Sequence, residues 1–166
     1  VHWHAVFTGS RAEKKVRDRL EELGVECFLP VQTVLRQWTY RKSRVVVPVI
    51  AGLVFVRVSR QEQVKVLQTK GVVAFLRLKG EAGAAVIPDK QMEDFRFLLD
   101  FSEEAVEMTN ENIKAGDLVR VVKGSLRGME GELIRHKGVT KVLVRIDMLG
   151  CAIVNIPASF VEKLNK

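Results

Sequence analysis

The sequence predicts an α+β protein of two domains, in which an antiparallel sheet with helices packed on it precedes a small β-barrel. Three observations support this. In residues 1–100, short β-branched runs alternate with apolar residues at helical spacing. Residues 101–113 are acidic and weakly periodic, as expected of an interdomain linker. Residues 114–166 contain only short strand-like runs separated by glycine-containing or polar turns.

The predicted elements of the first domain alternate between strand and helix. Ser10 with Glu13, and Ser59 with Glu62, have the spacing of capping boxes and so mark the start of two helices. A third helix begins at Pro88-Asp89. The full order is a strand at 2–7, a helix at 12–23, extended chain at 27–38 and 45–58, a helix ending by residue 71, a strand at 72–78 and the third helix.

The second domain consists of short strands, with the sequences GDLVRVV, GELIRH, TKVLVRID, CAIVNIP and ASFVEKL. Between the first two lies KGSLRGMEGELI, where Gly124, Gly128 and Gly131 accompany basic residues. A phosphate-binding loop would need a Lys-Ser or Lys-Thr pair followed by a helix, and this stretch has neither. The glycines therefore predict a tight turn between two strands of a five-stranded barrel.

Composition argues against several classes of protein. The net charge of +7 favours a polyanionic partner. No apolar run reaches the roughly 18 residues of a membrane-spanning helix, and no secretory signal is visible. Cys27 and Cys151 have no neighbours at ligand spacing, which predicts buried thiols in a cytoplasmic protein rather than a zinc site. Since no catalytic arrangement is visible either, we expect no enzyme activity, no catalytic residues, no metal and no cofactor.

Two parts of the chain resemble one known family. GDLVRVVKGSLRGMEGELI resembles a KOW motif, with Ser125 and Leu126 in place of the usual Pro and Phe. WHAVFTGSRAEKKVRDRLEELGVECFLP and IAGLVFVRV resemble the N-terminal domain of NusG-type transcription factors, and QTKGVVAFLR followed by VIPDKQMEDF continues the match in order. The resemblance covers nearly the whole chain. It implies an NGN-like α/β sandwich over 1–100 and an SH3-like KOW barrel over 114–166.

The resemblance implies an elongation and antitermination factor that binds the clamp of bacterial RNA polymerase and suppresses pausing or termination. The loop QWTYRKSR and the turn Thr69–Val72 are similar to those of specialised, operon-directed paralogs, the RfaH-like and UpxY-like antiterminators. In the family, an apolar concavity of the N-terminal domain holds the clamp helices. The residues that match it are Ile50, Leu53, Phe55, Met92 and Phe95. The alternative is that these five side chains belong to the hydrophobic core.

Two basic groups are candidates for binding non-template DNA. Arg11, Lys15 and Arg19 have the spacing of a stripe along one helix, which could follow a phosphate backbone. The resemblance adds Thr69 and Lys70 to this stripe; the alternative is an ordinary solvated helix. At the tip of a predicted hairpin, aromatic and basic residues could stack on unpaired bases, contact polymerase or simply pack together. These residues are Trp38, Tyr40 and Arg41.

The resemblance also implies that the KOW domain of a monomeric factor recruits a second protein. In related factors this partner is a ribosomal protein or the termination factor Rho, bound by apolar loop residues. Leu126, Met148 and Leu149 occupy comparable loops here, although such residues can equally cap the barrel. The rival interpretation is an RNA-binding or ribosome-associated KOW protein that does not act on polymerase.

Overall fold

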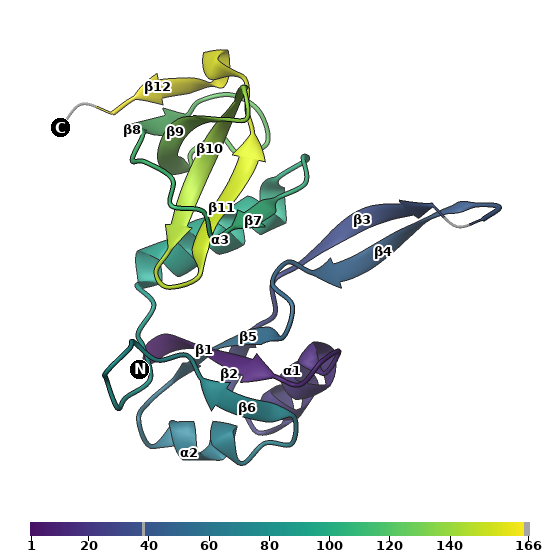
Figure 1. The fold of residues 1–166 in the computed structure, drawn as a ribbon, viewed down its shortest axis with the longest axis vertical. Coiled ribbons are helices and arrows are strands. Elements are labelled where there is room, and N and C mark those ends of the chain that lie inside the picture. Colours follow the sequence, from purple (N-terminus) through teal and green to yellow (C-terminus); the bar gives the residue numbers. More distant parts are fainter. Residues whose placement is uncertain (38, 165–166) are drawn as a thin grey trace. The chain divides into compact units, whose positions relative to one another are not determined.

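The computed structural model describes residues 1–37 and 39–164, and its contacts divide the chain into two compact units (Figure 1). These units are Val1–Asp89 and Lys90–Lys166. Helices and antiparallel sheets are both present, so the predicted α+β class is confirmed. The contacts group the third helix with the second unit, whereas composition alone places it in a first domain that ends at residue 100. The boundaries at residues 100 and 114 stay a prediction.

The first unit contains a four-stranded antiparallel sheet with the order β2-β5-β1-β6, and a separate two-stranded hairpin formed by β3 and β4. Its elements occur in the predicted order. They are β1 (His2–Thr8), α1 (Glu13–Glu22), β2 (Glu26–Phe28), β3 (Val31–Gln37), β4 (Lys42–Pro48), β5 (Leu53–Val58), α2 (Glu62–Leu67) and β6 (Val72–Phe75).

The core of the first unit lies between its sheet and the two helices. Val54, Val56 and Val58 point to one face of β5, because alternate strand residues share a face. They form a single buried cluster with Val16 and Leu20 of α1 and Val66 of α2. Leu53 and Phe55 point to the opposite face and are also buried, with the Phe55 ring stacked on that of Phe28 at 6.2 Å between centroids. Strand β5 is therefore buried on both faces.

One of the two predicted capping boxes is present. The Ser59 N–H donates to the Glu62 carboxylate at 3.0 Å, and the Glu62 N–H donates to the Ser59 hydroxyl at 3.3 Å. The predicted Ser10–Glu13 box is wrong, since α1 begins after Ala12 without a side-chain cap. The Glu13 carboxylate instead accepts the N–H of Gly52 at 3.2 Å, which ties the start of α1 to the turn before β5.

The second unit is a helix followed by a six-stranded antiparallel sheet with the order β12-β8-β9-β10-β11-β7. All five predicted strands are present, and the sixth, β7, lies inside the acidic segment predicted to be a linker. No helix in the described residues is long and apolar enough to cross a membrane. The elements are α3 (Asp89–Phe101), β7 (Glu107–Thr109), β8 (Asp117–Val121), β9 (Glu130–His136), β10 (Val139–Ile146), β11 (Gly150–Asn155), the 3-10 turn η1 (Ala158–Phe160) and β12 (Val161–Lys163).

The glycine-rich stretch is a turn between paired strands, as predicted. It joins β8 to β9, and β9 is a strand where a phosphate-binding loop would have a helix. Gly124 and Gly128 have φ values of +85° and +97°, which side chains with a Cβ rarely adopt. Gly131 has a different role, since a Cβ there would lie 2.9 Å from Val142 Cγ2.

The buried imidazole of His4 should make the first unit sensitive to acid. Burial lowers the pKa of His4 below its ordinary value of 6.5, an effect partly offset by the hydrogen bond that Nδ1–H donates to the Ala85 carbonyl at 2.8 Å. A lowered pKa means that the unfolded chain binds the proton more readily. The resulting stability is present above the unfolded pKa and is lost as pH falls toward the folded pKa.

We therefore expect His4→Gln to reduce the loss of unfolding free energy between about pH 7.5 and pH 5.5, because glutamine keeps a donor for Ala85 but does not titrate. Urea denaturation followed by tryptophan fluorescence measures this difference. His2→Gln is the matched control, since His2 is an exposed neighbour on the same strand. An equal loss of stability in wild type and His4→Gln would contradict the assignment.

Candidate functional sites

A basic groove in the first unit brings together α1, α2 and the turn that follows α2. Its volume is about 390 Å³, and its lining includes the basic residues Arg19, Lys65 and Lys70, the hydroxyl residue Thr69 and one carboxylate, Glu22. The Arg19 guanidinium donates to the Lys70 carbonyl at 2.7 Å, so the two residues are held side by side. The Lys70 side chain remains exposed. The structure thus joins three of the five residues predicted for the helix stripe and adds Lys65, which the sequence pattern did not indicate.

The groove depends on a close approach between the Thr69–Val72 turn and α1. Gly71 has a φ of +99°, and a Cβ there would lie 2.7 Å from Val16 Cγ2 and 3.4 Å from Arg19 Nη1. Thr69 is buried and its hydroxyl donates to the Lys65 carbonyl at 3.0 Å, which closes the turn on α2. Thr69 therefore shapes the groove, and the basic side chains of the groove are those of Lys65, Lys70 and Arg19.

Of Arg11 and Lys15, the other two residues of the predicted stripe, only Lys15 is helical. Arg11 precedes α1 in a turn and has a φ of +58°, unusual for a residue with a side chain. Both side chains are exposed. The predicted stripe thus consists of two helical residues, Lys15 and Arg19, preceded by a basic residue on a turn.

The β3–β4 hairpin extends from the sheet of the first unit as a two-stranded ribbon (Figure 1). Seven residue pairs join its strands, from Val31 opposite Pro48 to Gln37 opposite Lys42. Tyr40 is 97% exposed and Arg41 is also exposed, so both predicted tip residues are accessible. Trp38, the third predicted residue, lies outside the described residues.

The residues predicted to bind polymerase differ in accessibility. Leu53 and Phe55 are buried in the first unit, and Met92 and Phe95, on α3, are buried in the second. Only Ile50, in the bend between β4 and β5, is partly exposed. A surface built on the other four would require them to be uncovered, so Ile50 is the predicted contact that this structure offers to solvent.

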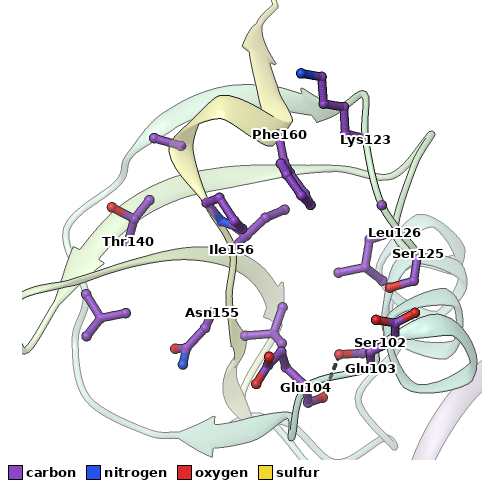
Figure 2. A pocket seen from close by; sticks show the side chains of 15 residues that line it. Ser102, Glu103, Glu104, Lys123, Ser125, Leu126, Thr140, Asn155, Ile156 and Phe160 are labelled. Carbon is purple, nitrogen blue, oxygen red and sulfur yellow. Dashed lines mark hydrogen bonds between the residues drawn. The ribbon is translucent and has the colours of Figure 1, made fainter.

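The predicted partner-binding residues of the second unit lie at opposite ends of the β10–β11 ladder. Met148 and Leu149 form the turn where Ile146 pairs with Gly150. Met148 is 38% exposed with a φ of +70°. Leu126 is buried beside the other end, in the lining of a cavity of about 480 Å³ that Figure 2 shows from close by. Sequence reasoning missed this cavity, because its walls come from segments far apart in the chain.

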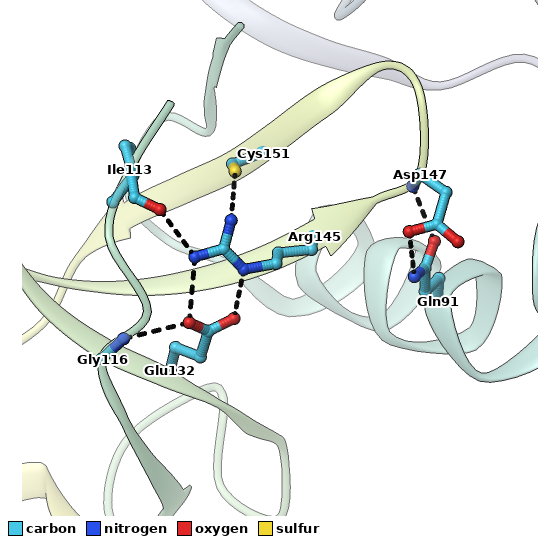
Figure 3. Close-up of polar contacts among 7 residues, drawn as sticks. All are labelled: Gln91, Ile113, Gly116, Glu132, Arg145, Asp147 and Cys151. Carbon is cyan, nitrogen blue, oxygen red and sulfur yellow. Dashed lines mark hydrogen bonds and ion pairs between the residues drawn. The ribbon is translucent and has the colours of Figure 1, made fainter. Parts of the chain in front are cut away.

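A polar cluster holds the acidic segment to the sheet of the second unit (Figure 3). Arg145 donates to both carboxylate oxygens of Glu132, at 2.7 and 3.1 Å, and to the Ile113 carbonyl at 2.9 Å. Glu132 also accepts the Gly116 N–H at 3.0 Å. The ion pair with Glu132 raises the pKa of Arg145 further above its usual range. Glu132 and Arg145 are diagonal neighbours in the β9–β10 register, a signal that becomes visible only once the strands are paired.

Figure 3 also shows how α3 contacts the second unit's sheet. The Gln91 amide donates to the Asp147 carboxylate at 2.9 Å, and the Asp147 N–H donates back to the Gln91 amide oxygen at 2.8 Å. This reciprocal pair joins the first turns of α3 to the β10–β11 turn. The sequence offered no sign of it, since the two residues are far apart.

Both cysteine thiols have a raised pKa. Burial raises the pKa of the Cys27 thiol to about 11 and also raises that of Cys151, so both are protonated near neutral pH. In the part of the chain that the structure describes, no three side chains of the metal-ligating types gather into a site.

The chain is similar to one protein family and to several solved structures. The family described as transcription termination factor nusG matches residues 1–96. Among solved structures, one of Thermotoga maritima NusG, described as showing domain interaction, is similar to this chain. The TM-score is 0.52 and the sequence identity is 23%, and the match covers 99% of this chain and 97% of that chain. The match therefore shows a shared fold. A search of curated proteins finds no match.

Two structures of the MjSpt4:Spt5 complex are also similar over 99% of this chain. Conformation B has a TM-score of 0.29 and 19% identity, covering 97% of that chain. Conformation A has a TM-score of 0.28 and 16% identity, covering 99% of that chain.

The close approach at Gly71 makes a specific stability prediction. Gly71→Ala should cost about 2 kcal/mol or more, because a strained φ is combined with a collision against α1. Gly80→Ala is the matched control, since Gly80 has a φ of +85° but a Cβ there would meet nothing within 4 Å. Urea unfolding of the two variants measures the difference. Equal costs would mean that backbone strain alone matters and that the turn does not depend on its contact with α1.

Proposed function

This chain belongs to the NusG family of transcription factors, and from that premise we propose that it is an elongation and antitermination factor. The match to the family spans residues 1–96, which include the basic groove, the hairpin and Ile50. In this proposal the first unit acts on bacterial RNA polymerase and on non-template DNA. The second unit, of KOW type, recruits another protein.

The proposal rests on one observation: the residues that line the basic groove lie within residues 1–96, the part of the chain that matches the family. Arg19, Lys65 and Lys70 line one groove although they come from three different segments. Lys15, one helical turn before Arg19 on α1, and Arg11, in the turn before α1, are exposed basic residues as well. Basic side chains arranged in this way bind phosphates without reading base edges, so they would hold non-template DNA whatever its sequence. The Thr69–Val72 turn that shapes the groove also supports assignment to the operon-directed paralogs.

Ile50 is the proposed contact with the polymerase clamp. It is half-buried and lies two residues after the end of β4, so it presents apolar surface at the base of the hairpin. Tyr40 and Arg41 at the hairpin tip are free to contact DNA or a second part of polymerase. The roles of Leu53, Phe55, Met92 and Phe95 stay predictions, because all four are buried.

The second unit would recruit Rho or a ribosomal protein, in line with the family resemblance. Exposed Met148 and its neighbour Leu149 are candidates for this contact. The factor would act as a monomer in the cytoplasm, where bacterial polymerase works. The decisive assay is promoter-initiated transcription on pause and terminator templates, with and without the full chain. No change in pausing or read-through would contradict the proposal.

A charge at Ile50 should abolish the effect on pausing. Burying an unpaired carboxylate in an apolar contact costs several kcal/mol, so Ile50→Asp should lose polymerase binding and antipausing activity together. The same transcription assay, with binding to core polymerase measured in parallel, tests this. Val64→Asp is the matched control, because Val64 is an apolar residue on α2 that is 57% exposed. Full activity of Ile50→Asp would exclude Ile50 from the contact.

Removing charge from the groove should weaken the salt dependence of DNA binding. Replacing Arg11, Lys15 and Lys70 by alanine should reduce the slope of log affinity against log salt by about 2, since each contact with single-stranded phosphate contributes roughly 0.7. Arg19 is kept, because it supports the Lys70 carbonyl. Fluorescence anisotropy with a labelled single strand, over a series of salt concentrations, measures the slope.

The matched control removes the same charge from the second unit. Lys114, Arg135 and Lys137 are exposed there, and their triple alanine variant should leave the slope unchanged. The rival function, an RNA-binding KOW protein that does not act on polymerase, reverses this expectation. If the second-unit variant loses affinity for nucleic acid and the groove variant does not, the rival is favoured.

A further inference from the structure

The cavity of the second unit is an apolar pocket with charged residues on its rim (Figure 2). Leu126, Val154 and Ile156 form a buried floor, and the half-buried ring of Phe160 forms one wall. The volume of about 480 Å³ is within the usual range for ligand-binding pockets. It lies entirely within the residues of the second unit, between the end of α3, the β8–β9 turn and the end of β11.

The walls of this pocket are held in place by the fold. The Val122 N–H donates to the Phe160 carbonyl at 2.7 Å, and the Ile156 N–H donates to the Thr140 carbonyl at 3.1 Å. A Cβ at Gly124 would lie 2.9 Å from Phe160 Cε2, so the glycine lets the ring lie against the turn. A pocket with fixed walls binds without a large ordering cost.

Charge on the rim is unevenly placed. Glu103 and Glu104 are exposed at one end, and Lys123 is exposed at the other, as Figure 2 shows. In the described residues none of these three side chains forms an ion pair. Several other charged groups of the same unit do, including Arg120 with Glu130 and Arg145 with Glu132. Glu103 and Glu104 therefore place two unpaired, exposed carboxylates at the edge of an apolar pocket.

We propose that this pocket binds an extended peptide segment of a partner protein, with one apolar side chain on the floor and a lysine or arginine beside Glu103 and Glu104. The inference rests on the proposed role of the second unit in recruitment and gives that role a site and a partner chemistry. The carboxylates favour a basic peptide and disfavour RNA, because phosphates placed near them would be repelled.

This site differs from the one expected from the sequence. Leu126, Met148 and Leu149 are the residues predicted to bind the partner, but Met148 and Leu149 lie at the far end of the β10–β11 ladder. Of the three, only Leu126 lines the pocket. Glu103 and Glu104, which looked like linker residues, become the residues that select the partner.

The test is panning of a phage-displayed library of random dodecapeptides on the full-length chain. Enriched peptides should share an apolar residue followed within a few positions by lysine or arginine. Synthetic versions should bind the Glu103→Lys/Glu104→Lys variant roughly tenfold more weakly, which corresponds to about 1.4 kcal/mol. Replacing the peptide's basic residues by glutamate should restore binding to that variant. Glu162→Lys, a reversal on exposed β12, is the matched control and should change nothing.

Three outcomes would overturn the proposal: no shared motif, peptide binding that is insensitive to the double reversal, or displacement of bound peptide by an oligouridine RNA. Both carboxylates are exposed and unpaired in the described chain, so the variant should remain folded, and circular dichroism verifies this. The assay contains no polymerase. Failure here with normal antipausing activity would reject the pocket alone, whereas peptide binding without any effect on pausing would reject the proposed function.

Discussion

Burial of β5 on both faces determines the arrangement of the first unit. Three valines pack one face against α1 and α2, while Leu53 and Phe55 bury the other. Strand β5 pairs with both β1 and β2, so it lies inside the sheet. The helices therefore pack where their apolar residues contact β5. The groove follows from this packing: α1 directs Arg19 toward the turn after α2, and Gly71 allows the turn to reach it.

Patterns that depend on neighbouring residues were predictable from the sequence. The strand and helix order follows from apolar spacing, and the Ser59–Glu62 box needs only residues within one helical turn. Ser10–Glu13 has the same spacing but fails, because Gly52 offers Glu13 a partner from a distant turn. The strand in the acidic segment was missed for a similar reason. Glu107–Thr109 has no apolar alternation and becomes a strand by pairing with β11.

The candidate sites, too, were predictable where their residues are close in sequence and not where tertiary packing brings them together. Residues on one helix, such as Lys15 and Arg19, could be grouped from their spacing, whereas Lys65 joins them only through tertiary packing. In the second unit, Leu126 and the pair Met148 and Leu149 lie at opposite ends of the β10–β11 ladder, and their role in partner binding stays a prediction. The pocket could not be anticipated, since the carboxylates of the acidic segment meet apolar residues from three other segments.

The two-stranded hairpin has a mechanical consequence. Among the described residues, strands β3 and β4 pair only with each other, and a ribbon of two strands is marginally stable in water. Leu35 and Val46 on one face are 63% and 46% exposed, so little apolar burial stiffens it. The free energy needed to bend or twist such a ribbon is small. A partner bound near the hairpin tip could therefore move relative to the sheet by bending the hairpin. Such movement would leave the packing of the first unit unchanged.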